Sequence, residues 1–167
     1  MNSRGFKKIK KEIFLSQCEF DNEICLKLYE GIKLPHRKTK SSAGHDIFTY
    51  KDVLLKPNET KVIQTGIKAY MKPDEFLAIY IRSSFGFKYN IRLMNQVGII
   101  DADYYNNPDN DGHIMVAIQN QGAKEKLIKK DEAFAQGIFQ KYLISENDTT
   151  SQIRVSGVGS TDEELKR

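Results

Sequence analysis

The chain has 167 residues, of which 40% are hydrophobic and 29% charged, with a formal net charge of +4 at pH 7. This length favours one domain, and the hydrophobic fraction argues against a disordered chain. No apolar run approaches ~18 residues, so no membrane-spanning helix is expected. The basic start, MNSRGFKKIKKEIF, lacks the apolar stretch of a secretory signal. Cys18 and Cys25 match no zinc-binding pattern and are expected to be reduced thiols of a cytoplasmic protein.

Much of the positive charge lies in the first eleven residues and between His36 and Lys40. Such a surface can attract nucleic acid or a phosphate-bearing small molecule, but a solvated face is the simpler interpretation. A membrane-surface helix with Phe6, Ile9 and Ile13 on one face is a weaker hypothesis, because the stretch is short and fits an edge strand equally well. We therefore expect no membrane association and no specific nucleic-acid partner.

Strand-like segments follow one another along the chain, separated by turn residues. The first is EICLKLYE at 23–30, where apolar and polar residues alternate. Further segments lie at 45–55, 60–71, 76–84, 90–100, 112–122 and 125–144. Short strands between regular turns predict an all-β sandwich or barrel. We expect a β domain over 1–150, in which residues 1–30 are an extension with one strand at most, and a mobile C-terminal arm over 151–167.

Five short stretches have the composition of sites rather than of packing. They are SAGHD (42–46), RSS (82–84), NQVGIIDADYY (95–105), DEAFAQG (131–137) and RVSGVGST (154–161). A guanidinium beside two hydroxyls suits a phosphate or a carboxylate, and glycines let backbone amides approach anionic oxygens. Singly each signal is weak, since Arg-Ser-Ser is usually a turn and a Gly/Ser tail is usually a linker. No Walker, Rossmann or H-E-x-x-H pattern is present in the sequence.

The order and spacing of these stretches resemble the five motifs of the trimeric dUTPase family, the deoxyuridine triphosphate nucleotidohydrolases. SAGHDI is similar to S-A-G-x-D-[LI], and RSS is similar to [PR]-R-S-[SG]. NQVGIIDADY is close to N-x-V-G-[VI]-I-D-x-D-Y and is the most specific match. DEAFAQGIF resembles G-D-R-I-A-Q-x-[IV]-F, and RVSGVGST resembles R-x-[GT]-G-G-F-G-S-T-G. The resemblance covers about residues 34–161.

The resemblance implies a jelly-roll-like β-clip domain that assembles as a homotrimer, with active sites between subunits and the last motif on the C-terminal arm. It implies hydrolysis of dUTP to dUMP and pyrophosphate by water attack at the α-phosphorus, which limits uracil in DNA and supplies dUMP for dTMP synthesis. One Mg²⁺ is implied, held by triphosphate oxygens and water rather than by direct protein ligands.

The resemblance also assigns roles to individual residues. Asp101 would be the base that activates water, Gln136 would lie near the α-phosphate, and Tyr104 would lie against the deoxyribose, where a 2′-hydroxyl would clash. The other substrate-binding residues would be Asn95 and Gly98 at uracil, Arg82, Ser83 and Ser84 at the phosphates, and Arg154, Gly159, Ser160 and Thr161 at the γ-end. Asp46 would reach the water shell of the metal or brace the first motif, and Asp103 is expected to stabilise the turn.

Three departures from the family pattern stand out. A longer Asn/Asp/Pro-rich loop occupies 105–112, and Ala133 stands where the family has arginine. Val158 takes the place of the phenylalanine that stacks on the base, and Asp162 takes the place of the final glycine. Valine cannot stack, so closure of the arm is expected to be weaker. The aromatic residues that would compensate are Phe85, Phe87 and Tyr105.

Three other functions remain as alternatives. A dCTP deaminase of the same fold would need a catalytic glutamate in the strand after the third motif, where Ala117 stands. A regulatory trimer would bind a protein partner through the 105–112 loop, the basic N-terminus and the tail. Simple nucleic-acid binding rests on charge alone.

Overall fold

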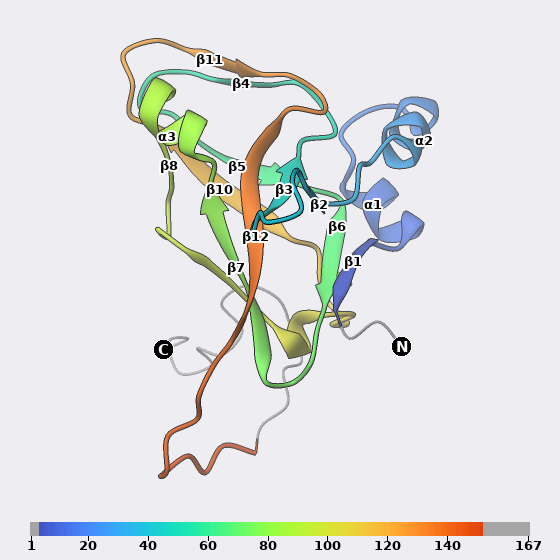
Figure 1. Ribbon diagram of the computed structural model, residues 1–167. Coiled ribbons are helices and arrows are strands. Elements are labelled where there is room, and N and C mark those ends of the chain that lie inside the picture. The colour runs from blue at the N-terminus through green and yellow to red at the C-terminus, as the bar shows by residue number, and fades with distance from the viewer. Residues whose placement is uncertain (1–3, 152–167) are drawn as a thin grey trace, which may run out of the picture.

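The computed structural model describes residues 4–151, and strands dominate that range (Figure 1). The first strands are β1 (Gly5–Lys8), β2 (His36–Arg37), β3 (His45–Phe48), β4 (Val53–Leu55), β5 (Thr60–Gln64) and β6 (Ile67–Tyr70). They are followed by β7 (Glu75–Ile81), β8 (Ile91–Leu93), β9 (Gly98–Asp101), β10 (Met115–Asn120), β11 (Lys126–Ile128) and β12 (Ala133–Lys141). The helices are α1 (Lys11–Gln17), α2 (Asn22–Glu30), α3 (Ser83–Tyr89) and the 3-10 helix η1 (Ala102–Tyr104). The all-β prediction is therefore confirmed.

The largest sheet has five strands in the order β2-β3-β12-β7-β9, and a three-stranded sheet has the order β5-β10-β8. Two further pairs, β1-β6 and β11-β4, complete the arrangement, and the paired strands run antiparallel. β12 lies in the middle of the large sheet, because it pairs with β3 on one side and with β7 on the other. Beyond β12 and Tyr142, the exposed residues 143–151 run away from the sheets (Figure 1).

The core is formed by alternate residues of several strands together with side chains from α1, α3 and the connecting segments. In β10, for example, Val116 and Ile118 are buried while Met115 is exposed, as the two-residue period of a strand requires. The largest fully buried side chains include Phe14, Phe85, Phe134, Ile47, Leu77, Ile79 and Ile114. Burying each such side chain contributes roughly 1.5–3 kcal/mol.

The N-terminal extension contains the strand β1 and two helices that were not predicted from the sequence. β1 pairs with β6, with Phe6 opposite Ala69. The strand expected at 23–30 is wrong, because this segment is α2. Cys25, Leu28 and Tyr29 recur at helical spacing and pack into or against the core.

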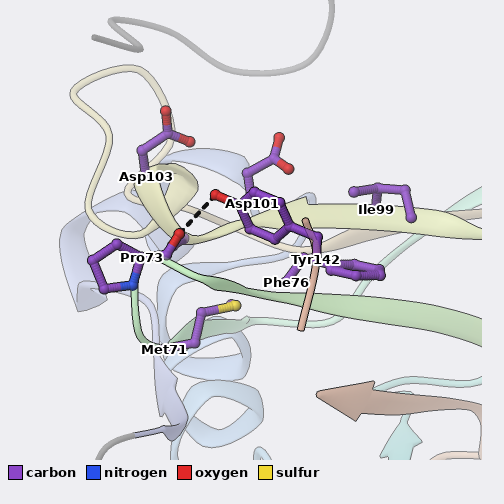
Figure 2. Close-up of a pocket in the computed structure, with 8 residues that line it drawn as sticks. Met71, Pro73, Phe76, Ile99, Asp101, Asp103 and Tyr142 are labelled. Atoms are coloured by element: carbon purple, nitrogen blue, oxygen red, sulfur yellow. Dashed lines mark hydrogen bonds between the residues drawn. The ribbon is translucent and has the colours of Figure 1, made fainter. Parts of the chain in front are cut away.

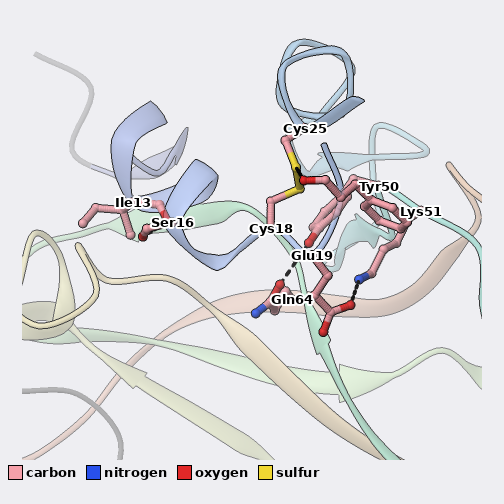
Figure 3. The surroundings of a disulfide bond; sticks show 9 residues. Ile13, Ser16, Cys18, Glu19, Cys25, Tyr50, Lys51 and Gln64 are labelled. Carbon is pink, nitrogen blue, oxygen red and sulfur yellow. Dashed lines mark hydrogen bonds and ion pairs between the residues drawn. A yellow bond between two sulfur atoms is a disulfide. The ribbon is translucent and has the colours of Figure 1, made fainter. Parts of the chain in front are cut away.

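A disulfide joins Cys18, just after α1, to Cys25 in α2, so the expectation of reduced thiols is wrong (Figure 3). The bend between the two helices brings the Cα atoms to 6.1 Å, a separation that suits a disulfide. Sequence spacing could not show this, because C-x6-C brings the thiols together only if the segment folds into two helices. Cytoplasmic thiols are mostly kept reduced, so the disulfide disagrees with the expected cytoplasmic location.

Two further segments differ in detail from expectation. The residues after β7 form α3, whose Phe85 side chain is anchored in the core and whose C-terminal Asn90 is left-handed with φ of 52°. The DEAFAQG stretch, which had features of a helical turn, enters β12 through a register shift between Ala133 and Ala135. No helix within residues 4–151 is long and apolar enough to cross a membrane.

Candidate active site

Three of the five motifs meet at one end of β7, because β12 pairs with both β3 and β7. Gln136 on β12 lies opposite Asp46 on β3 and opposite Tyr80 on β7. Arg82 follows the last residue of β7 directly, and Ser83 and Ser84 form the first turn of α3. The register of a single sheet therefore gathers the first, second and fourth motifs.

Contacts on two sides orient the Arg82 side chain. Its Nε lies 3.2 Å from Asp46 Oδ1, and its Nη1 donates to the backbone oxygen of Ala133 at 3.2 Å. Asp46 therefore braces the second motif through an ion pair with the arginine. Ala133, which replaces the family's arginine, takes part through its backbone oxygen.

Gly44 is needed because the Gln136 side chain packs directly against its Cα. A Cβ on residue 44 would overlap Oε1 of Gln136 and lie 3.1 Å from its Cδ. The glycine of the first motif therefore leaves room for the amide of the fourth motif.

The third motif follows β8 and runs through a turn into β9. β8 pairs with β10 and β9 pairs with β7, so the turn joins strands of two different sheets. In the turn, Gln96 has φ of 63°, and Val97 N donates to Asn95 O at 2.6 Å. Gly98 lies opposite Ile79 on β7, and a Cβ on Gly98 would lie 3.1 Å from Ile79 Cβ. The glycine therefore permits β9 to pack closely on β7.

β9 ends at an open cavity of about 710 Å³ that Asp101 and Asp103 line (Figure 2). The remaining lining residues are Met71, Pro73, Phe76, Ile99, Ala102 and Tyr142. Tyr142 donates its hydroxyl to the backbone oxygen of Pro73 at 2.7 Å. Two carboxylates thus lie beside a largely apolar surface. Asp103 lies in η1, at the turn that it was expected to stabilise.

Tyr104 is buried, with 6% of its surface exposed, and its hydroxyl has two partners. The hydroxyl donates to the backbone oxygen of His113 at 3.1 Å and accepts from Asn110 Nδ2 at 2.8 Å. The sequence did not mark His113 or Asn110 as relevant to the site. The only signal was the concentration of Asn, Asp and Gly in the 105–112 loop.

The two groups of predicted site residues lie toward opposite ends of β7. Asp101 is opposite Phe76, whereas Gln136 is opposite Tyr80. Four residues of a strand span roughly 13 Å. Within one chain, therefore, the Asp101 carboxylate and the Gln136 amide do not approach the same atom of a ligand.

A family model described as dUTPase matches residues 30–162. The chain belongs to the dUTPase family. Its relatives include the deoxyuridine 5'-triphosphate nucleotidohydrolase of Lactococcus lactis subsp. lactis (strain IL1403), 44% identical over 133 residues, which are 78% of this chain and 89% of the relative. The crystal structure of dUTPase from Streptococcus mutans has a TM-score of 0.68 and 32% identity, and the match covers 85% of this chain and 98% of that one. A mutant dUTPase from phage phi11 of S. aureus, described with a structural Mg(II) ion, shares the fold with a TM-score of 0.66. The two sequences are 18% identical, and the match covers 91% of this chain and 99% of that one.

As a dUTPase, the chain departs from the family's fifth motif, and the described residues limit what can replace the stacking phenylalanine. Phe85 is wrong as a candidate because it is 2% exposed in the core. The Tyr105 ring packs against Tyr70 with centroids 5.9 Å apart and lies under Lys68 Nζ at 5.0 Å. Phe87 is 92% exposed. Arg154, Val158, Gly159, Ser160 and Thr161 lie outside the described residues.

Gly44→Ala is expected to lower kcat by about 10- to 100-fold, because the added methyl displaces the Gln136 side chain from its position. Steady-state kinetics with dUTP, together with thermal unfolding, measure the effect. Gly86→Ala is the matched control, because its Cβ would meet only Ile81 Cγ2 at 4.0 Å. Equal kcat values for the two variants would show that the close packing of residues 44 and 136 is unimportant for turnover.

Proposed function

We propose that this protein is a dUTP diphosphatase that hydrolyses dUTP to dUMP and pyrophosphate, limiting uracil in DNA and supplying dUMP for dTMP synthesis. The observation that carries the proposal is the third motif, in which β9 ends with Asp101 at the edge of a cavity of about 710 Å³. Two curated relatives, 44% and 33% identical to this chain, are named deoxyuridine 5'-triphosphate nucleotidohydrolases.

The proposed reaction is an in-line attack of water on the α-phosphorus. The water oxygen bonds to the α-phosphorus, the bond between that phosphorus and the bridging oxygen breaks, and pyrophosphate leaves. Water needs a base at neutral pH, and Asp101, half-buried at the end of β9, accepts the proton. Gln136 orients the α-phosphate or the water.

The proposed substrate contacts are divided between the site residues at the two ends of β7. The turn at Asn95 and Gly98 receives uracil, and Tyr104 lies against the deoxyribose. Arg82, already oriented by Asp46, binds the phosphate chain with Ser83 and Ser84. In the C-terminal arm, Arg154, Gly159, Ser160 and Thr161 would close over the γ-end.

Mg²⁺ is proposed as the cofactor, held by triphosphate oxygens and water. The carboxylate nearest the proposed phosphate-binding group belongs to Asp46, which is paired with Arg82 at 3.2 Å. We therefore assign the direct coordination of the ion to the substrate rather than to this side chain. When bound, the ion neutralises charge on the phosphates.

A homotrimer with active sites between subunits is proposed because one chain keeps the two groups apart. Asp101 pairs with Phe76 and Gln136 pairs with Tyr80, and these two positions are roughly 13 Å apart along β7. Both residues can reach one α-phosphate only if Asp101 of one subunit meets Gln136 of another. We propose the cytoplasm as the place of action, although the Cys18–Cys25 disulfide is unusual for that compartment.

Pyrophosphate release is expected from dUTP in clear preference to dTTP, dCTP and UTP. Asp101→Asn keeps the shape of the side chain but removes the base, so it should lower kcat by about 100-fold or more. Assays of pyrophosphate and ammonia with all four nucleotides check this result. Ammonia release from dCTP would instead support the deaminase alternative, in spite of Ala117 on β10.

Mixing two inactive variants is expected to restore activity. In trimers co-refolded from equal amounts of Asp101→Asn and Gln136→Ala, about a quarter of the sites combine an intact Asp101 with an intact Gln136 from a neighbouring subunit. Activity of each variant alone is the control. If the mixture is no more active than its components, the sites lie within single chains.

The regulatory alternative also becomes more specific. In the 105–112 loop the side chains of Asn107, Asn110 and Asp111 are buried, whereas Pro108 and Asp109 are exposed. The inward side chains fix the shape of the loop, so a protein partner would contact the outward ones.

The double variant Pro108→Glu/Asp109→Lys is expected to abolish binding of such a partner without changing dUTP hydrolysis, because neither side chain contributes to the buried part of the loop. Affinity capture with the wild-type protein and with the variant measures this. If both retain the same proteins, the loop has no partner-binding role.

A further inference from the structure

The N-terminal extension lies almost wholly outside the family match, which begins at residue 30. The extension is nevertheless attached firmly to the β domain. β1 extends β6 as an antiparallel partner, and Ile9 and Phe14 are 1% and 2% exposed. The Tyr29 hydroxyl donates to Ile9 O at 2.9 Å and joins the end of α2 to the chain before α1. The extension therefore forms a fixed part of the structure.

Two hydrogen bonds link this extension to the chain between Tyr104 and β10. The backbone N–H of Lys10 donates to Asp111 Oδ2 at 2.7 Å. Gln17, the last residue of α1, places its Oε1 2.7 Å from Nδ1 of His113. Asp111 is also paired with Lys68 at 2.7 Å, and both side chains are buried. The loop therefore rests on the extension at two points.

The bonds of His113 define its tautomer. The backbone N–H of Gly66 donates to Nε2 at 2.9 Å, so Nε2 carries no proton. Nδ1 consequently carries the hydrogen and donates it to Gln17 Oε1. The side chain is 0% exposed, and this burial lowers the pKa of His113 to about 4, although nearby Asp111 acts in the opposite direction. The ring is therefore neutral at neutral pH, and Gln17 is the acceptor that matches it.

His113 also holds Tyr104 through its backbone. Its carbonyl oxygen accepts the Tyr104 hydroxyl at 3.1 Å, and Asn110 donates to the same hydroxyl at 2.8 Å. Tyr104 follows Asp101 by three residues and shares η1 with Asp103. A displacement of His113 would therefore move the far end of the Tyr104 ring.

We propose that the N-terminal extension sets sugar selectivity, with Gln17 as a positioning residue that acts on Tyr104 through His113. This proposal rests on the proposed function, in which Tyr104 faces the deoxyribose. The acceptor oxygen of Gln17 fixes the imidazole, the imidazole fixes the backbone at residue 113, and that backbone fixes the tyrosine hydroxyl. The clearance that excludes a 2′-hydroxyl thus depends on a segment outside the family match.

Gln17→Met tests the proposal, because methionine keeps the length and removes the acceptor. The ratio of kcat/KM for dUTP to kcat/KM for UTP is expected to fall about tenfold as Tyr104 loses its fixed position. Ser16→Ala is the matched control, because the Ser16 hydroxyl bonds only Ile13 O of the same helix in the described structure. Gln17→Glu retains an acceptor oxygen and should keep the ratio within about twofold of wild type.

A double-mutant cycle separates this role from general stabilisation. Tyr104→Phe removes the hydroxyl, so adding Gln17→Met to it should lower the selectivity ratio by less than about twofold further. Independent, multiplicative effects would overturn the proposal, as would an unchanged ratio in Gln17→Met.

If Gln17→Met does not fold, Gln17→Asn replaces it in the cycle, because its oxygen is one methylene too short to reach His113. A wild-type protein inactive on dUTP would instead refute the proposed function.

Discussion

The pairing register of β7 is the constraint on which the site arrangement depends. Its residues pair with β12 on one side and with β9 on the other, so one strand determines where Gln136 and Asp101 lie. A slip of one residue would turn both side chains to the opposite face of the sheet. Gly98 packs closely against Ile79, and Gly137 packs closely against Leu77. A residue with a Cβ in place of either glycine would bring that atom within 3.1 Å of the facing side chain. A slip that moved a larger residue into either place would therefore be opposed. Register and catalysis are therefore specified by the same contacts.

The turn of the third motif could be predicted from the sequence because local chemistry determines it. A turn between two apolar strands is visible around Asn95 and Gly98, and β8 and β9 lie on its two sides. The approach of Asp46 to Arg82 could not be predicted in this way, because residues 36 positions apart meet only after β12 has paired with both β3 and β7. For the same reason, the sequence suggested two roles for Asp46 and could not choose between them.

The extension was harder to predict than the β domain. Ile24, Leu26 and Leu28 alternate as in a strand, but Cys25, Leu28 and Tyr29 also have helical spacing, and contact with the core decided between the two patterns. The disulfide could not be predicted either, because Cys25 reaches Cys18 through the fold of residues 22–30 as a helix. The burial of Asp111 and His113 could not be predicted, because polar side chains in and beside an Asn/Asp-rich loop are usually expected to face solvent.

Gly44 illustrates how a motif residue can be required by its neighbour rather than by its own backbone. Its Cα is covered by the end of the Gln136 side chain, which comes from a strand about 90 positions later in the chain. The two positions therefore share one volume, and a larger side chain at residue 44 is compatible only with a smaller one at residue 136. In families of this fold, substitutions at these two positions should occur together, so that a change at one predicts a compensating change at the other.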